Sequence, residues 1–188
     1  RLDRVDAVVF DAPVLLTAPG DVPDVTMAAL SELDPEQVTV LGGPDAVSEE
    51  AEAQASQGTR AETDRVAGDT RNHTAADITR ATQAATDNAA NWPGGQRAAF
   101  VTTGEDFPDA LAASALAARD GHPVPVLLTL PGTVPEPTDR AIEDLGIDLA
   151  VIIGGEDAVS AGVEDHLDDG DTTTDRVAGD TRTETATA

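Results

Sequence analysis

The chain has 188 residues, of which 40% are apolar, so it can bury a sheet-and-helix core and is too apolar to be a disordered acidic tail. Its 36 acidic residues face only 11 basic ones, all of them arginine, for a net charge of −25, and nucleic acid is not an expected partner because polyanions are held by clustered Lys and Arg. The absence of cysteine excludes a disulfide framework, thiolate chemistry and a zinc site of the cysteine type.

Apolar periodicity in the second part of the chain predicts strands that alternate with helices. The strands are short buried runs that end at glycine, and the helices are rich in Ala and Leu. In chain order we predict a strand at 65–68, a helix at 74–85, a strand at 98–103, a helix at 109–119, a strand at 124–129, a helix at 137–145, a strand at 149–153 and a helix at 160–167. This order predicts an α/β fold in which a parallel sheet is flanked by helices on both faces, a Rossmann-like three-layer arrangement.

Three blocks of sequence occur twice in the same order. Residues 13–17 return as 125–129 and residues 41–48 return as 153–160, both after 112 residues, and 64–71 is repeated unchanged as 175–182 after 111 residues. A period of this length is that of a small domain rather than a solenoid unit, so we interpret the blocks as repeated modules.

The repeat also predicts where the modules begin and end. If a module starts at Arg65, residues 1–64 are the C-terminal part of a first module, 65–175 a complete second module, and 176–188 the start of a third. We therefore expect the chain to be part of a longer protein. We also expect residues 13–64 to superpose on 125–175, with 14–16 and 126–128 both in strands.

The repeated blocks carry recognisable motifs over essentially the whole chain. They are an Arg-hydrophobic-Ala-Gly opening at 65–75 and 176–186, Gly-x-x-Phe-x-Asp-Ala-Leu-Ala at 104–112, Pro-hydrophobic-Leu-Leu-Thr at 13–17 and 125–129, and Gly-Gly-x-x-Ala-Val-Ser at 42–48 and 154–160. In this order the motifs resemble the cell wall-binding repeat 2 family of bacterial and archaeal surface proteins. The sequence departs from the family pattern at Thr70 and Thr181, where the family usually has Asp, and at Asn72 and Thr183, where it usually has Tyr.

The resemblance implies a non-catalytic, extracellular module at the cell surface. Such modules, commonly three per protein around a pseudo-threefold axis, tether a secreted protein noncovalently to an anionic or neutral wall polymer. The expected partners are therefore an envelope polysaccharide and other copies of the module, with no cofactor. No run approaches 18 apolar residues, so no membrane span is expected in this chain.

The charge predicts adaptation to concentrated salt. Self-repulsion at −25 opposes compaction at low ionic strength, whereas at about 1 M salt the screening length falls to roughly 3 Å. The alternative is an ordinary acidic protein from a high-GC genome.

Candidate binding residues follow the predicted strands, because ligands of α/β sheets bind at the carboxyl ends of strands. At these ends lie Thr17, Gly42, Gly43, Thr103, Asp106, Thr129, Gly154 and Gly155. The glycine pairs fit a tight turn, with Ser48 and Ser160 capping the next helix, better than direct ligand contact. Thr103 and Asp106 fit sugar hydroxyls and a structural role equally well, and Asp109 suits a helix cap.

Arg71 and Arg182 are cations in repeated segments. A guanidinium can hold a carboxylate or phosphate in two parallel hydrogen bonds, but the many acids nearby favour an internal ion pair with Asp69 or a neighbouring acid.

Catalysis and metal binding find little support in the sequence. There is no Gly-x-Ser-x-Gly elbow, and His73, His122 and His166 fall in unrelated contexts. The acidic run 165–171 lacks the ligand spacing of a calcium loop, so we expect no metal site. Two rival functions stay open: an α/β enzyme acting on a glycan or nucleotide at the same strand ends, and a purely structural surface-layer module.

Overall fold

The computed structural model describes residues 6–7, 12–57, 59–85, 89–105, 110–111, 113–114, 117 and 123–179. Six residues singled out above lie outside the described residues: Asp106, Asp109, His122, Thr181, Arg182 and Thr183.

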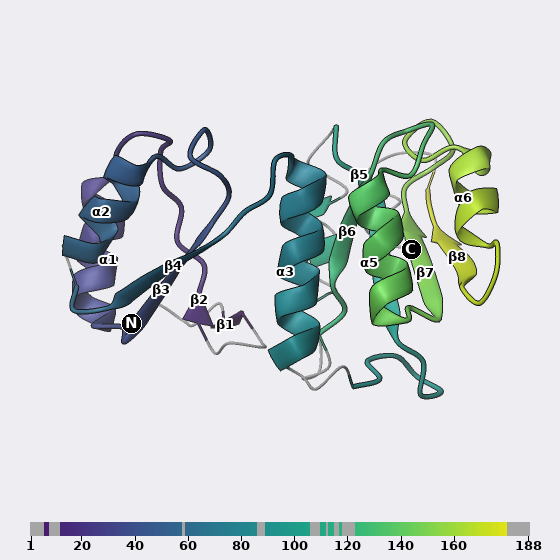
Figure 1. The fold of residues 1–188 in the computed structure, drawn as a ribbon, viewed down its shortest axis with the longest axis horizontal. Helices are drawn as coiled ribbons and strands as arrows, with labels where there is room; N and C mark the ends of the chain where they lie inside the picture. The colour runs from purple at the N-terminus through teal and green to yellow at the C-terminus, as the bar shows by residue number, and fades with distance from the viewer. Residues whose placement is uncertain are drawn as a thin grey trace.

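The C-terminal unit is built on a four-stranded sheet whose pairings are all parallel (Figure 1). Its strands lie in the order β6-β5-β7-β8. They span Ala98–Thr103 (β5), Val126–Thr129 (β6), Leu149–Ile153 (β7) and Thr173–Val177 (β8). The helices are α3 (Arg71–Ala85), α5 (Glu136–Leu145) and α6 (Ala161–Leu167). The predicted α/β class, with a parallel sheet flanked by helices, is confirmed.

Both faces of this sheet are apolar. Alternate residues along a strand point to opposite sides of the sheet, so a strand whose successive residues are apolar contributes to a core on each side. Ala99 and Val101 of β5 belong to the core on the side of α3, α5 and α6. Phe100 belongs to the core on the other side, where the Trp92 ring meets it edge-on at a centroid distance of 6.1 Å. Ala113, in the segment predicted as a helix at 109–119, is helical and fully buried on that second side.

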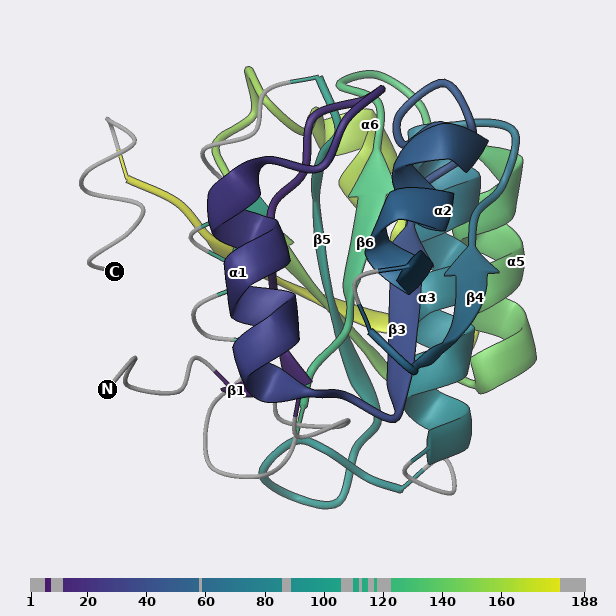
Figure 2. The same cartoon turned by 90° about the vertical axis from the view of Figure 1, so that its left-hand side faces the viewer.

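The N-terminal unit has a smaller sheet and its own core. The strands β3 (Gln37–Leu41) and β4 (Glu62–Val66) pair in parallel, and the helices α1 (Asp24–Leu33) and α2 (Glu49–Gln57) pack beside them (Figure 2). Two short strands, β1 (Asp6–Ala7) and β2 (Ala12–Pro13), pair antiparallel. The buried core of this unit consists of Val22, Leu30, Ala51 and Ala55.

The expected strand at residues 14–16 is wrong. Val14, Leu15 and Leu16 lie outside any strand, and Val14 and Leu16 are 62% and 81% exposed, whereas Val126–Thr129 forms β6. A strand needs a hydrogen-bonded neighbour, and β6 has one in β5. In the described part of the chain, no strand lies beside 14–16.

The predicted module boundaries fall inside strands. Residues 64 and 65 are neighbours in β4, which pairs with β3 of the N-terminal unit, and residues 175 and 176 are neighbours in β8, which pairs with β7. After β4 the chain runs through 67–70 directly into α3, which packs against β6 and α5 of the other unit. The segment that opens each predicted module therefore supplies an edge strand to the preceding sheet.

Helix α3 begins at Arg71, three residues before the predicted start. Thr70 provides the missing signal, because its Oγ1 accepts a hydrogen bond from the His73 amide (3.4 Å), which is the position of a helix cap.

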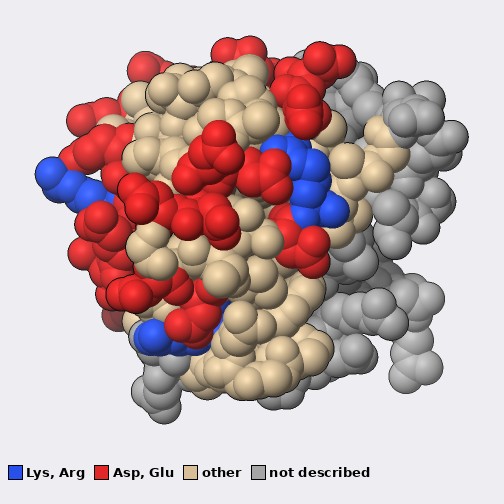
Figure 3. All heavy atoms as spheres, turned by 90° about the vertical axis from the view of Figure 1, so that its right-hand side faces the viewer, with Lys and Arg blue, Asp and Glu red and all other residues tan. Residues whose placement is uncertain are grey.

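Charged side chains cover much of the surface, and several described arginines are paired with acids. On the face formed by α6 and β8, carboxylates lie close to one another and to the few arginines (Figure 3). Arg140 contacts Glu136 at 2.6 Å, with both side chains more than half exposed. His166 contacts Asp139 at 3.0 Å, which links α6 to α5.

Candidate functional site

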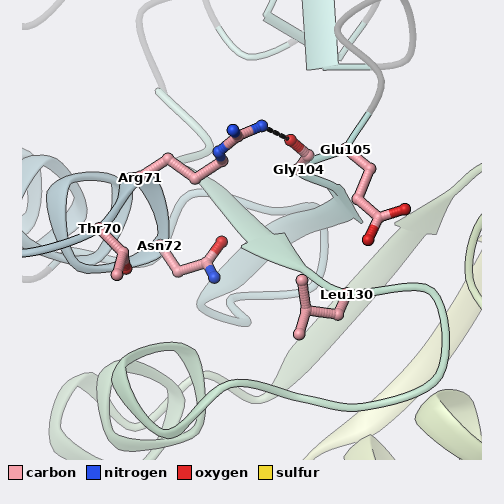
Figure 4. A pocket seen from close by; sticks show the side chains of 6 residues that line it. All are labelled: Thr70, Arg71, Asn72, Gly104, Glu105 and Leu130. Atoms are coloured by element: carbon pink, nitrogen blue, oxygen red, sulfur yellow. Dashed lines mark hydrogen bonds between the residues drawn. The ribbon is translucent and has the colours of Figure 1, made fainter. Parts of the chain in front are cut away.

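A pocket of about 330 Å³ opens where the carboxyl ends of β5 and β6 meet the first turn of α3 (Figure 4). The residues that line it are Thr70, Arg71, Asn72, Gly104, Glu105 and Leu130. Strand ends and a helix N-terminus converge there, and parallel sheets usually bind ligands at such places.

Arg71 bridges the first turn of α3 to the end of β5. Its Nη1 donates a hydrogen bond to the Gly104 carbonyl oxygen. A Cβ at Gly104 would lie 3.3 Å from both the Arg71 Cδ and the Asn72 Oδ1, so a glycine there permits the close approach. The expected ion pair with Asp69 is wrong for the described residues, which offer Arg71 no carboxylate within 4.0 Å. Within that part of the chain, the bond to Gly104 is the one hydrogen bond of the Arg71 side chain, and Arg71 lines the pocket (Figure 4).

The other walls combine an amide, a carboxylate and an apolar side chain. Asn72 and Glu105 lie on opposite sides of the pocket, and Leu130 lies below them in the view of Figure 4. The Asn72 Oδ1 is buried and has no hydrogen-bond partner within the described part of the chain. Leu130 is 38% exposed and presents apolar surface to the pocket. Asn72, Glu105 and Leu130 were not predicted as site residues; the open apolar residue directly after a buried strand was the available signal.

The predicted threonines face inward. Thr103 is 4% exposed, and its Oγ1 accepts from the Glu105 amide at 3.2 Å. Thr129 is fully buried, and its Oγ1 donates to the Thr133 carbonyl oxygen at 3.0 Å. Both hydroxyls hold the backbone beneath the pocket. Thr17 lies in the N-terminal unit, away from Arg71 in sequence and in sheet, and its hydroxyl donates to the Asp21 carbonyl oxygen.

The glycine pairs make turns. Gly42 and Gly154 have φ angles of 115° and 120°, a region that side chains rarely adopt. The Gly43 carbonyl oxygen accepts from the Val47 amide, and the Gly155 carbonyl oxygen accepts from the Val159 amide, both at 2.9 Å. Neither Gly154 nor Gly155 lines the pocket.

Ser48 and Ser160 cap the helices that follow these turns. The Ser160 Oγ accepts from the Val163 amide at 3.4 Å, and the Ser48 Oγ accepts from the Ala51 amide at 3.2 Å. We expect Ser160→Ala to lower the free energy of unfolding by about 0.5 to 1 kcal/mol, because the Val163 amide loses its side-chain acceptor and keeps only the Ser160 carbonyl oxygen at 3.0 Å. Chemical denaturation measures this loss, and an unchanged midpoint would show that water replaces the hydroxyl.

Two arginines that were not predicted as site residues hold the glycine turns in place. Arg65 donates from Nη1 to the carbonyl oxygens of Gly42 and Val47 and from Nε to Glu52 (3.1 Å). Arg176 makes the same set of bonds to Gly154 (2.8 Å), Val159 (3.0 Å) and Glu164 (3.0 Å). We call each set a guanidinium clasp. Arg65 and Arg176 occupy the same position in the repeated blocks 64–71 and 175–182, and this repetition was the sequence signal for the clasp.

No helix in the described ranges is both long and apolar enough to cross a bilayer. Across those same ranges, His, Asp and Glu side chains form no group of three or more suited to holding a metal ion.

A known protein family matches the part of the chain that contains the pocket. Residues 65–164 match the family model described as cell wall binding domain 2 (CWB2). The match includes α3, β5, β6, α5 and β7, and therefore every residue that lines the pocket.

Two curated proteins of Bacillus subtilis (strain 168) are similar to most of the chain. An amidase enhancer is 29% identical over 93% of this chain, and the N-acetylmuramoyl-L-alanine amidase LytC is 29% identical over 84%. The matched regions make up 22% and 29% of those proteins.

Two solved structures from Clostridium difficile share the fold. Cwp6 superposes with a TM-score of 0.82 at 26% identity, and Cwp8 with a TM-score of 0.71 at 28% identity, each over 96% of this chain. The chain spans 27% of Cwp6 and 31% of Cwp8.

Proposed function

Because this chain belongs to the cell wall binding domain 2 family, we propose that it attaches a larger protein to a polysaccharide of the cell envelope, outside the cell and in concentrated salt. The family match makes it a binding module associated with the cell wall. The choice of polymer, the extracellular location, the module boundaries at 64/65 and 175/176 and the adaptation to salt are parts of the proposal.

The pocket at the end of β5 carries the proposal. It is concave, it combines polar groups of both charges with an apolar wall, and it lies where parallel sheets usually bind ligands. Arg71 offers guanidinium donors there, and a hydrogen bond to a charged group is worth about 1.5 to 3 kcal/mol. Arg182, at the equivalent place in the repeated segment, is proposed to serve the next module in the same way.

An attachment role also accounts for the small share of each relative that this chain matches. The chain matches less than a third of each of the two Bacillus relatives. Their names describe an amidase and an enhancer of an amidase, and those activities belong to the whole proteins. This arrangement fits a longer protein in which one module attaches to the cell wall and another part carries the activity.

Arg71→Ala is expected to weaken binding without unfolding the protein. Sedimentation with purified envelope sacculi in about 1 M KCl should show an apparent affinity lower by about tenfold, because one charge-assisted contact is lost. The melting temperature should change little, since the Arg71 side chain is exposed and has one hydrogen bond among the described residues.

Arg140→Ala is the matched control, because Arg140 is also exposed and lies outside the pocket. Equal sedimentation of the wild type and the Arg71 variant would show that Arg71 does not contact the polymer. A large fall in melting temperature would show instead that its bond to Gly104 is structural. Release of soluble sugar from the sacculi by the wild type would favour the rival enzyme.

A further inference from the structure

We propose that the pocket recognises an uncharged sugar ring through adjacent hydroxyl groups, rather than a phosphate or carboxylate group of the polymer. This inference deepens the attachment function and rests on it. It names the chemical class of the ligand from the charges, the hydrogen-bonding groups and the apolar wall of this one pocket.

The charges in the pocket oppose an anion. Among the described residues that line it, Arg71 is the only cation, and Glu105 places a carboxylate in the same wall. The guanidinium is also partly engaged, because its Nη1 donates to the Gly104 carbonyl oxygen. A bound phosphate would be attracted by one of these charges and repelled by the other, and both lie close enough to act in concentrated salt.

The hydrogen-bonding groups suit hydroxyls. A carboxylate only accepts hydrogen bonds and a guanidinium only donates them, whereas a hydroxyl does both. Two adjacent hydroxyls of a sugar can therefore bridge Arg71 and Glu105, with one accepting and the other donating. The Asn72 side chain on the opposite wall adds an amide, and its buried Oδ1 has no partner among the described residues.

The apolar wall suits the carbon face of a ring. Leu130 follows β6 and exposes 38% of its surface in a wall otherwise made of polar side chains and backbone. Sugar rings have an apolar C–H face as well as hydroxyls at their edge, so a ring that lies on Leu130 directs its edge toward Arg71 and Glu105. A small anion gains nothing from this contact.

The substitution Glu105→Gln separates the two classes of ligand by the sign of its effect. If Glu105 accepts from sugar hydroxyls, Glu105→Gln should lower the apparent affinity for envelope sacculi about tenfold, because a charge-assisted bond is lost. If the pocket holds an anion, the same change removes a repulsive charge and binding should become tighter. Glu143→Gln, at an exposed position on α5 outside the pocket, is the control.

Competition provides an independent readout on the full chain. In about 1 M KCl, where long-range repulsion is screened, glucose, mannose and N-acetylglucosamine should release the protein from sacculi at lower concentrations than inorganic phosphate or glucuronate. Leu130→Ala should weaken both binding and the effect of the neutral sugars. Melting temperatures of all variants identify any that fail to fold.

The possible failures are distinguishable. If the wild type does not sediment with sacculi at all, the attachment function is wrong. If it sediments, but Glu105→Gln binds more tightly and phosphate competes better than the neutral sugars, attachment stands and the neutral-sugar inference is overturned.

Discussion

Arg176→Ala is expected to lower the free energy of unfolding by about 2 to 4 kcal/mol, the largest effect of any single substitution considered for this chain. The Arg176 side chain is only 16% exposed and makes its four hydrogen bonds to two carbonyl oxygens and one carboxylate. Its removal leaves the Glu164 carboxylate and the Gly154 and Val159 carbonyl oxygens without this donor. Urea denaturation at fixed salt measures the loss.

The exposed pair Arg140 and Glu136 gives the matched control. It has a short contact of 2.6 Å on one helix, yet both side chains are largely in solvent, so Arg140→Ala should cost only about 0.3 to 0.5 kcal/mol. In molar KCl the small effect should disappear, whereas the loss at Arg176 should persist because a largely buried pair is screened less. If the two substitutions cost the same, the guanidinium clasp contributes no more than a surface ion pair.

Folding is expected to require salt. With a net charge of −25, the melting temperature should rise by roughly 10 °C or more between low salt and about 1 M KCl, as repulsion among surface carboxylates is screened. KCl is the suitable salt, because sulfate would also strengthen apolar burial. Circular dichroism at increasing KCl concentration measures the transition.

A variant with fewer charges tests the cause. Asp165, Asp169 and Asp171 are exposed around the end of α6, and replacing all three with Asn should raise stability at low salt and reduce the dependence on KCl. A melting temperature that stays flat from low to molar salt would contradict the proposed adaptation, whatever the effect of the triple substitution.

The fold could be predicted largely because its strands carry a strong signal. Runs such as Ala98–Thr103 and Leu149–Ile153 are buried along their whole length and end at glycine, and both strands form with these bounds. The segment 14–16 has the same residues as 126–128, but it forms no strand. Local sequence could not decide this difference, because a strand depends on a neighbour that lies far away in the chain.

The residues of the candidate site could be predicted only in part. The prediction that Arg71 lies near the carboxyl ends of strands rests on the parallel sheet, and Arg71 does border one pocket with the end of β5, whereas Gly154 and Gly155 lie outside that pocket. Which side chains face the pocket depends on packing. Thr103 and Thr129 are the last residues of β5 and β6 and turn inward, whereas Glu105 and Leu130 follow these strands and line the pocket. The pairing of Arg65 with Glu52 joins a strand to a helix across the turn, a contact that no periodicity reveals.

The connection from β4 to α3 determines how the protein would carry a mechanical load. A side chain at Gly68 would place its Cβ 2.2 Å from the His73 Cβ, so the connection is tightly folded against the start of the helix, and the Gly68 amide donates to Thr74 at 3.1 Å. A force applied along β4 is therefore transmitted from α3 to the strand without first extending the connection between them. Because β4 pairs with β3 over five residues in parallel, such a pull acts along the strands and loads their hydrogen bonds together, in shear, instead of opening them one at a time. An attachment module exposed to flow or growth would resist detachment best in this direction.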